Sequence, residues 1–131
     1  MSKEKKVLYI EDNPTNLLLI EHILARVPQV EMFSATNPVA GLELAVTKVP
    51  DLILLDINLP GMDGYQVLQK LRENNLTENI PVIAISANAM SQDIEKGKGA
   101  GFVDYLTKPI DIQNFLDLLG KTLHITIESF E

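Results

Sequence analysis

Short apolar runs alternate along the chain with longer segments in which apolar residues recur at helical spacing. A short apolar run between turn-forming residues predicts a buried strand. Five such strands are predicted, at residues 7–10, 31–35, 51–55, 81–85 and 102–106, of which the second is the least apolar. A broad apolar stripe predicts the first helix over residues 14–27, where Pro28 stops it.

Capping residues place the other four helices. Asn37 followed by Pro38 predicts an N-cap and a first helical residue, with the helix running to about residue 48. Gly64 opens the third helix, Ser91 is predicted to cap a short fourth helix interrupted by glycines, and Asp111 is predicted to cap the last. The inner faces are expected to carry Val39, Leu42 and Val46 in the second helix, Val67, Leu68 and Leu71 in the third, and Ile112, Phe115, Leu116, Leu119 and Leu123 in the last.

Strands that alternate with helices indicate an α/β fold. Right-handed helical crossovers between strands imply a parallel sheet that is covered by helices on both faces, a (βα)5 three-layer sandwich. The length of 131 residues predicts a single domain with a substantial core. In such sheets ligands bind outside the carboxyl ends of the strands, near the point where the strand order reverses.

Composition narrows the class of function. The chain contains no cysteine, which excludes a disulfide framework and a thiolate metal site. Its 11 basic and 18 acidic residues give a net charge of −7, which argues against nucleic acid as the main partner. No apolar stretch approaches membrane-spanning length, and the first six residues do not resemble a signal peptide. We therefore expect a cytoplasmic domain that does not by itself enter a membrane.

Acidic residues follow two of the predicted strands. Glu11 and Asp12 come directly after the first strand, and Asp56 comes directly after the third. Carboxylates that meet at one edge of a sheet raise one another's pKa values, and a divalent cation removes that conflict. Oxygen donors of this kind suit Mg²⁺. Glu11 and Asp12 alone are explained more simply as charge at a helix N-terminus, but together with Asp56 they favour a metal site.

From its position alone, Asp56 is open to three interpretations: a metal ligand, a helix cap or a nucleophile. A carboxylate that attacks phosphorus forms an acyl phosphate, and a metal ion neutralises charge on the transferring group. Lys108 supplies an ammonium group for a phosphate oxygen, and Pro109 biases it toward an extended or turn geometry, with a cis bond as a candidate. Ser86 can donate a hydroxyl hydrogen bond to phosphate, and Ala87 leaves room for a group to approach.

The chain resembles the receiver domains of two-component response regulators. The resemblance covers about residues 6–121, so that residues 122–131 are expected to form a C-terminal tail. The elements that carry it are Glu11-Asp12, Asp56, Ser86-Ala87, Tyr105 and Lys108-Pro109, in this order at predicted strand ends. Residues 9–14 and 58–64 look more like receivers attached to hybrid sensor histidine kinases.

The resemblance implies a flavodoxin-like fold with the parallel strand order 2-1-3-4-5. It also implies transfer of phosphate to Asp56 from the phosphohistidine of a sensor histidine kinase or a histidine phosphotransfer protein. The reaction would depend on Mg²⁺, or on Mn²⁺ in its place. Asp12, Asp56 and the backbone carbonyl of Asn58 would hold the metal, and Glu11 would act mainly through water.

The resemblance assigns Ser86 and Lys108 to the phosphate and Tyr105 to a switch, in which its ring swings inward when the Ser86 hydroxyl moves. By its sequence alone, Tyr105 is equally an ordinary half-buried strand tyrosine. Asn88 is neutral where an acid would position or repel water, which leaves the lifetime of an aspartyl phosphate open.

The output surface is expected to lie on the fourth and fifth strands and the last two helices. The glycines between residues 91 and 101 weaken the fourth helix, so that its packing is easily shifted by added phosphate. This face is expected to contact a downstream effector or a second copy of the domain.

Three other functions fit parts of the pattern. A hydrolase of the haloacid dehalogenase type needs a second acid two residues after its nucleophile, where this chain has Asn58. A nucleotide or flavin module needs a glycine- or hydroxyl-rich loop after the first strand, where this chain has Glu11 and Asp12. A receiver that only binds partners and is never phosphorylated is disfavoured by the full set of site residues.

Overall fold

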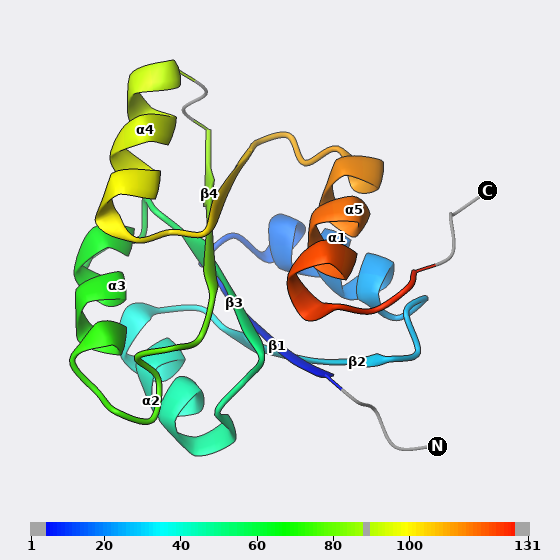
Figure 1. Cartoon of the computed structure of the whole chain (residues 1–131), viewed down its shortest axis with the longest axis horizontal. Coiled ribbons are helices and arrows are strands. Elements are labelled where there is room, and N and C mark those ends of the chain that lie inside the picture. The colour runs from blue at the N-terminus through cyan, green and yellow to red at the C-terminus, as the bar shows by residue number, and fades with distance from the viewer. Residues whose placement is uncertain (1–4, 88–89, 128–131) are drawn as a thin grey trace.

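The computed structural model describes residues 5–87 and 90–127, in which strands and helices alternate as predicted (Figure 1). The strands are β1 (Lys5–Ile10), β2 (Val30–Ala35), β3 (Leu52–Asp56), β4 (Val82–Ser86) and β5 (Asp104–Thr107). The helices are α1 (Pro14–Leu24), α2 (Pro38–Lys48), α3 (Gly64–Arg72), α4 (Ser91–Ala100) and α5 (Ile112–Leu123). Within the described residues, no helix is both long enough and apolar enough to span a membrane.

The strands form one parallel sheet in the order β2-β1-β3-β4-β5. After β1 the chain moves outward to the edge strand β2, then returns past β1 to β3 and continues to β5, so the order reverses between β1 and β3. The predicted flavodoxin-like order is therefore confirmed. A reversal of this kind opens a crevice at the carboxyl ends of the two strands beside it.

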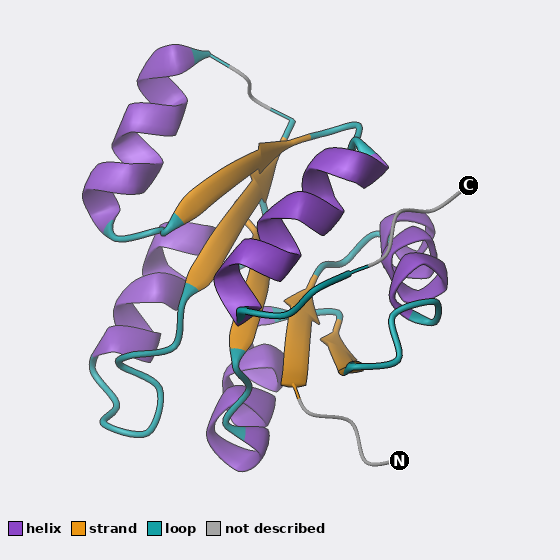
Figure 2. Cartoon of the chain, turned by 45° about the vertical axis from the view of Figure 1, so that its right-hand side comes forward, coloured by secondary structure: helices purple, strands orange, loops and turns teal. Residues whose placement is uncertain are grey.

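The sheet is covered on both faces. Helices α1 and α5 lie over one face, and α2, α3 and α4 lie over the other (Figures 1 and 2). Alternate residues of β1 enter the two layers: Val7 and Tyr9 pack with α1 and α5, whereas Leu8 and Ile10 pack with α2 and α3. Because both faces are covered, β3 and β4 are buried along their whole length.

Helix caps follow the predictions at two helices and depart from them at a third. The side chains of Asn37 and Asp111 each accept a backbone N–H from the first turn of α2 or α5 at 2.9 Å, as predicted. The predicted cap of α4 is wrong by one residue. Ser91 is already helical, and Met90 occupies the N-cap position without a side-chain cap hydrogen bond. α4 therefore begins without the stabilisation that the other two helices receive.

The predicted inner face of α2 is wrong at two positions. Val39 and Val46 are 63% and 37% exposed, whereas Gly41 and Ala45 are buried. A Cβ atom on Gly41 would lie only 2.5 Å from Cδ1 of Ile10 in β1. The small residues let α2 approach the sheet closely. This close packing, rather than the spacing of the larger apolar side chains, determines which face of α2 is buried.

Several boundaries differ from the predictions by one to three residues. α1 ends at Leu24, and β5 begins at Asp104. Asp56 and Ser86 are the last residues of β3 and β4 rather than the first residues after them. The sheet itself therefore positions both side chains. Ile112, the first residue of α5, is 42% exposed rather than inward; the other predicted inner residues of this helix are buried.

The described part of the tail turns back after α5. The backbone N–H of Ile125 donates to the carbonyl of Gly120 at 3.1 Å, and the Gln29 side chain donates to the carbonyl of Thr126 at 2.8 Å. Ile125 and Ile127 pack against the core layer of α1 and α5. These contacts attach the tail to the end of the molecule opposite the carboxyl edge of the sheet.

Candidate functional site

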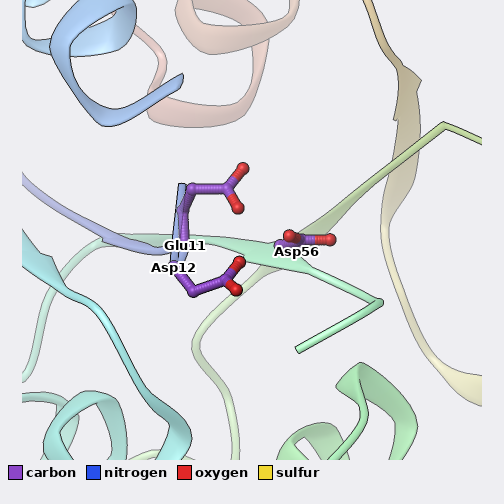
Figure 3. Close-up of side chains that lie close together, drawn as sticks. All are labelled: Glu11, Asp12 and Asp56. Carbon is purple, nitrogen blue, oxygen red and sulfur yellow. The ribbon is translucent and has the colours of Figure 1, made fainter. Parts of the chain in front are cut away.

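Three carboxylates meet at the carboxyl ends of β1 and β3. In Figure 3, Glu11 and Asp12 leave the end of β1 on opposite sides of the strand, and both point toward Asp56. One carboxylate oxygen of each residue lies within 4.8 Å of the others. Glu11 and Asp56 are buried and Asp12 is exposed, so the cluster is open to solvent on the Asp12 side. The predicted convergence of these residues is therefore present.

Lys108 connects the two buried acids. Its Nζ lies 2.9 Å from Oε1 of Glu11 and 3.4 Å from Oδ2 of Asp56. The backbone N–H of Lys108 donates to the carbonyl of Ser86 at 2.8 Å, which extends the β4–β5 pairing by one residue. The Lys108–Pro109 peptide bond is cis. The lysine thus reaches the acids from β5, across β4.

Glu11 accepts hydrogen bonds from two further side chains that the sequence analysis missed. The Tyr9 hydroxyl donates to Oε1 at 2.9 Å, and Nδ2 of Asn16 donates to the same oxygen at 3.2 Å. The backbone N–H of Asn13 lies 3.4 Å from Oε2. The spacing of Tyr9 and Glu11 contained the signal, because residues two apart along a strand share a face.

Burial and neighbouring charges shift the pKa values of the charged groups in opposite directions. Burial first, and the hydrogen bond with Glu11 second, raise the pKa of Asp56 to about 6. Burial alone would also raise the pKa of Glu11, but hydrogen bonds with Asp56, Lys108 and Tyr9 outweigh it and lower that pKa to about 2. Glu11 therefore keeps its negative charge, while Asp56 holds a proton more readily than a free aspartate.

Two neighbours of the acids are held in the protonated form. Burial would lower the pKa of Lys108, yet its hydrogen bond to Glu11 and the charge of Asp56 raise that pKa above its usual value. Burial first and the Glu11 charge second raise the pKa of Tyr9 well above its usual value. The Lys108 ammonium and the Tyr9 hydroxyl therefore remain hydrogen-bond donors to Glu11.

Asn58 connects Asp56 to Ser86. The backbone N–H of Asn58 donates to Oδ1 of Asp56 at 3.0 Å, and its side-chain amide lies 3.4 Å from the Ser86 hydroxyl oxygen. Ser86 is 1% exposed, and Ala87, which follows it, is exposed at the end of β4. Asn88, the other residue expected to affect access, lies outside the described residues.

Tyr105 reaches the neighbourhood of Ser86 through a cavity of about 230 Å³. Tyr105 is half-buried, and its ring lies against α4, where a Cβ atom on Gly97 would come within 2.9 Å of Cδ2. Lys96 lies 4.6 Å above the centre of the Tyr65 ring at the same cavity. The cavity is lined by Ile57, Asn58, Asp63, Tyr65, Ser86, Asp93, Lys96 and Tyr105.

The donor atoms of the acidic cluster suit a hard divalent cation. Among the described residues, the cluster contains carboxylates and no histidine or cysteine, and one of its acids faces solvent. Mg²⁺ prefers oxygen ligands and keeps several waters, which such an open site permits. Lys108 supplies a positive charge that contacts both Asp56 and Glu11. The site therefore offers a buried carboxylate, Asp56, next to an ammonium group and to acids that suit a metal ion.

Comparisons with known proteins agree with this geometry. Residues 7–120 match the family model of the response regulator receiver domain. The chain is 35% identical over 119 residues to the polar-differentiation response regulator DivK of Brucella anthropi, a match that covers 91% of this chain and 96% of DivK. It is 38% identical over 111 residues to RpaA of Synechocystis, a DNA-binding dual master transcriptional regulator. That match covers 85% of this chain and 46% of RpaA, so the chain spans about half of this relative.

A solved structure extends the likeness to the site. The receiver domain of the sensor histidine kinase PA1611 from Pseudomonas aeruginosa PAO1 matches with a TM-score of 0.82 and 30% identity, over 92% of this chain and 98% of that domain. That structure has a magnesium ion coordinated in its active-site cleft. The family model covers most of the chain and DivK matches over nearly its full length, so the chain belongs to the response regulator receiver domain family of two-component signalling.

Proposed function

We propose that Asp56 accepts a phosphoryl group from a phosphohistidine on a sensor histidine kinase or a histidine phosphotransfer protein. A carboxylate oxygen of Asp56 attacks phosphorus, the N–P bond of the donor breaks, and the imidazole nitrogen keeps the electron pair and takes up a proton. The observation that carries the proposal is the setting of Asp56, buried at a strand end yet 3.4 Å from Lys108 and within 4.8 Å of two other acids.

Mg²⁺ is the proposed cofactor, and Mn²⁺ can replace it because it accepts the same oxygen ligands. Asp12, Asp56 and the backbone carbonyl of Asn58 would hold the ion, and Glu11 would contact its water ligands. The bound ion supplies neutralisation of negative charge on the transferring group. The acidic cluster and the magnesium ion in the PA1611 receiver support this assignment.

Lys108 and Ser86 are proposed to contact the phosphoryl group. Lys108 already lies within 3.4 Å of Asp56, so its ammonium group can follow negative charge from the carboxylate to a phosphoryl oxygen with little movement. Ser86 ends the strand next to β3 and carries a buried hydroxyl beside Asn58. Ala87 is exposed after it and leaves space for the incoming group.

The proposed output surface consists of β4, α4, β5 and α5. Tyr105 lies beside a cavity that also contacts Ser86, so movement of the serine toward phosphate would open space for the ring. α4 has no side-chain cap and contacts Tyr105 at Gly97, which makes it the element whose packing is most easily changed. A downstream effector or a second copy of the chain would bind the changed surface.

Beryllofluoride, a mimic of the phosphoryl group, tests the proposal when added with Mg²⁺ and followed by NMR. Incubation with acetyl phosphate and Mg²⁺ tests covalent phosphorylation, which is measured as an increase in the intact mass of the protein. We expect one acid-labile phosphate on the wild type and none on Asp56→Asn. Asp51→Asn, an exposed acid before the same strand, is the matched control and should behave as the wild type.

The outcome distinguishes the alternatives. A protein that binds neither beryllofluoride nor phosphate would be a receiver that acts only by binding partners, and the proposal would be wrong. Repeated turnover of simple phosphate esters would indicate a hydrolase of the haloacid dehalogenase type instead. Asn58 argues against the hydrolase, because an amide cannot supply the acid and base steps that repeated hydrolysis needs.

A further inference from the structure

Tyr9 stands out among the buried residues of β1 because it carries a hydroxyl into an otherwise apolar core layer. It is 0% exposed, and its neighbours across the sheet are Ser34 in β2 and Leu54 in β3. A buried tyrosine hydroxyl needs a hydrogen-bond partner, since an unpaired one costs free energy. The partner is Glu11, which is also 0% exposed and lies on the same side of β1.

The two oxygens of Glu11 have unequal surroundings. Oε1 accepts from the Tyr9 hydroxyl at 2.9 Å, from Asn16 Nδ2 at 3.2 Å and from Lys108 Nζ at 2.9 Å. Among the described residues, the one hydrogen-bond donor near Oε2 is the backbone N–H of Asn13, at 3.4 Å. These three donors to Oε1 fix the carboxylate at the acidic cluster, where one of its oxygens lies within 4.8 Å of oxygens of Asp12 and Asp56.

We propose that Tyr9 and Asn16 are positioning residues that hold the Glu11 carboxylate in this orientation, in which it would contact water ligands of the metal ion. The proposal rests on the proposed function, because it assumes that the acidic cluster binds Mg²⁺. The proposal also explains why residue 11 is a glutamate. The side chain is long enough for its carboxylate to accept from the Tyr9 hydroxyl at 2.9 Å and still belong to the acidic cluster.

Residues that hydrogen-bond to a metal-binding side chain and fix its orientation usually affect the affinity for the metal ion. Loss of such a partner commonly reduces metal affinity about tenfold or more. Tyr9→Phe keeps the buried ring and removes only the hydroxyl, and Asn16→Ala removes the second donor from α1. We expect each variant to weaken Mg²⁺ binding by about tenfold, because Glu11 then loses its fixed orientation.

The experiment measures the Mg²⁺ dissociation constant by calorimetry or by NMR titration, without any phosphate donor. Thr77→Val is the matched control: Thr77 is also 0% exposed, and its hydroxyl donates to the Leu71 carbonyl at 2.6 Å on the far side of the molecule. It should lower the midpoint of urea unfolding, as Tyr9→Phe does, but leave Mg²⁺ affinity unchanged. A purely structural role for Tyr9 would make the two variants alike.

A double-mutant cycle identifies the partner. In a Glu11→Asp background the shorter side chain no longer reaches the Tyr9 hydroxyl, so Tyr9→Phe should have no further effect on Mg²⁺ affinity. Equal Mg²⁺ affinity in the wild type, Tyr9→Phe and Asn16→Ala would overturn the positioning role and leave the proposed function intact. Absence of Mg²⁺ binding by the wild type would contradict the proposed function itself.

Discussion

The two halves of the carboxyl edge differ in how firmly their side chains are held. At the ends of β1 and β3, Glu11 and Asp56 are buried and joined through Lys108 by contacts of 2.9 and 3.4 Å. In the half formed by β4 and β5, Tyr105 lies half-buried within β5, against helix α4, which has no side-chain cap. It lies beside a cavity of about 230 Å³ that Ser86, the last residue of β4, also lines. The first half holds charges in place for chemistry, and the second has space in which packing can change.

The difference has a physical origin. A buried charge must be paired, so the acids and the lysine bind one another strongly enough to fix their positions. An aromatic ring at the surface has no such requirement and can occupy more than one position at a small cost in free energy. Substitutions in the first half should therefore strongly alter metal binding and phosphorylation. Substitutions in the second half should alter conformation, with smaller changes in the free energy of unfolding.

Lys108→Ala should have the largest effect. It removes the cation next to Asp56, and the rate of phosphorylation by acetyl phosphate should fall on the order of 100-fold. Intact mass against time measures the rate, and Lys121→Ala on α5 is the control. If the rate falls by less than threefold, Lys108 does not assist phosphorylation from its position between Glu11 and Asp56.

Asp56→Asn should stabilise the protein at neutral pH without Mg²⁺. The pKa of Asp56 is about 6 in the folded protein against 3.8 in the unfolded chain, so the folded state binds the proton more tightly. The ionised group therefore lowers the free energy of unfolding above pH 6, and this penalty disappears as the pH falls below the unfolded value. The variant should gain about 3 kcal/mol at pH 7.5 and almost nothing near pH 3.5.

Urea unfolding of both proteins at the two pH values measures this gain. Adding Mg²⁺ at pH 7.5 should reduce the difference in the free energy of unfolding between Asp56→Asn and the wild type, because the ion stabilises the wild type more than the variant. A gain that persists unchanged at the lower pH would mean that the burial of charge on Asp56 is not its cause.

Gly97→Ala and Gly99→Ala compare two positions of α4 that differ in their surroundings. Alanine favours a helix over glycine by about 1 kcal/mol. A Cβ atom on Gly99 meets nothing within 4 Å, so this variant should show the gain. On Gly97 it would lie 2.9 Å from the Tyr105 ring, so the gain should be lost and the ring displaced.

Thermal unfolding measures the two stabilities, and the NMR shifts of the Tyr105 ring report its displacement. Equal stabilisation with unchanged Tyr105 shifts would show that Gly97 does not set the position of the ring.

Lys96→Met should have the smallest effect. Lys96 lies 4.6 Å above the Tyr65 ring at the edge of the cavity, and an exposed contact of this kind contributes about 0.5 kcal/mol. Lys98→Met on the same helix is the control for loss of charge. A difference above about 1.5 kcal/mol between the variants in urea unfolding would mean that α4 is held more firmly than we infer.

The sequence predicts much of the site because of the geometry of parallel sheets. Strand ends meet at one edge, so Glu11, Asp56, Ser86 and Lys108 could be grouped from their places after predicted strands. The sequence analysis missed Tyr9 as a partner of Glu11. Their spacing of two residues places them on one face of the strand, but the spacing does not show that the hydroxyl reaches the carboxylate at 2.9 Å.

The sequence by itself determined the order of strands and helices and the set of residues at the carboxyl edge, because local periodicity and strand-end position encode them. The motifs at those positions indicated the family by resemblance. Only the tertiary structure decided which face of α2 is buried and which oxygen of Glu11 is occupied. It also placed the Tyr105 ring against Gly97. These depend on the close approach of segments distant in sequence, and contact between atoms, rather than periodicity, sets their energies.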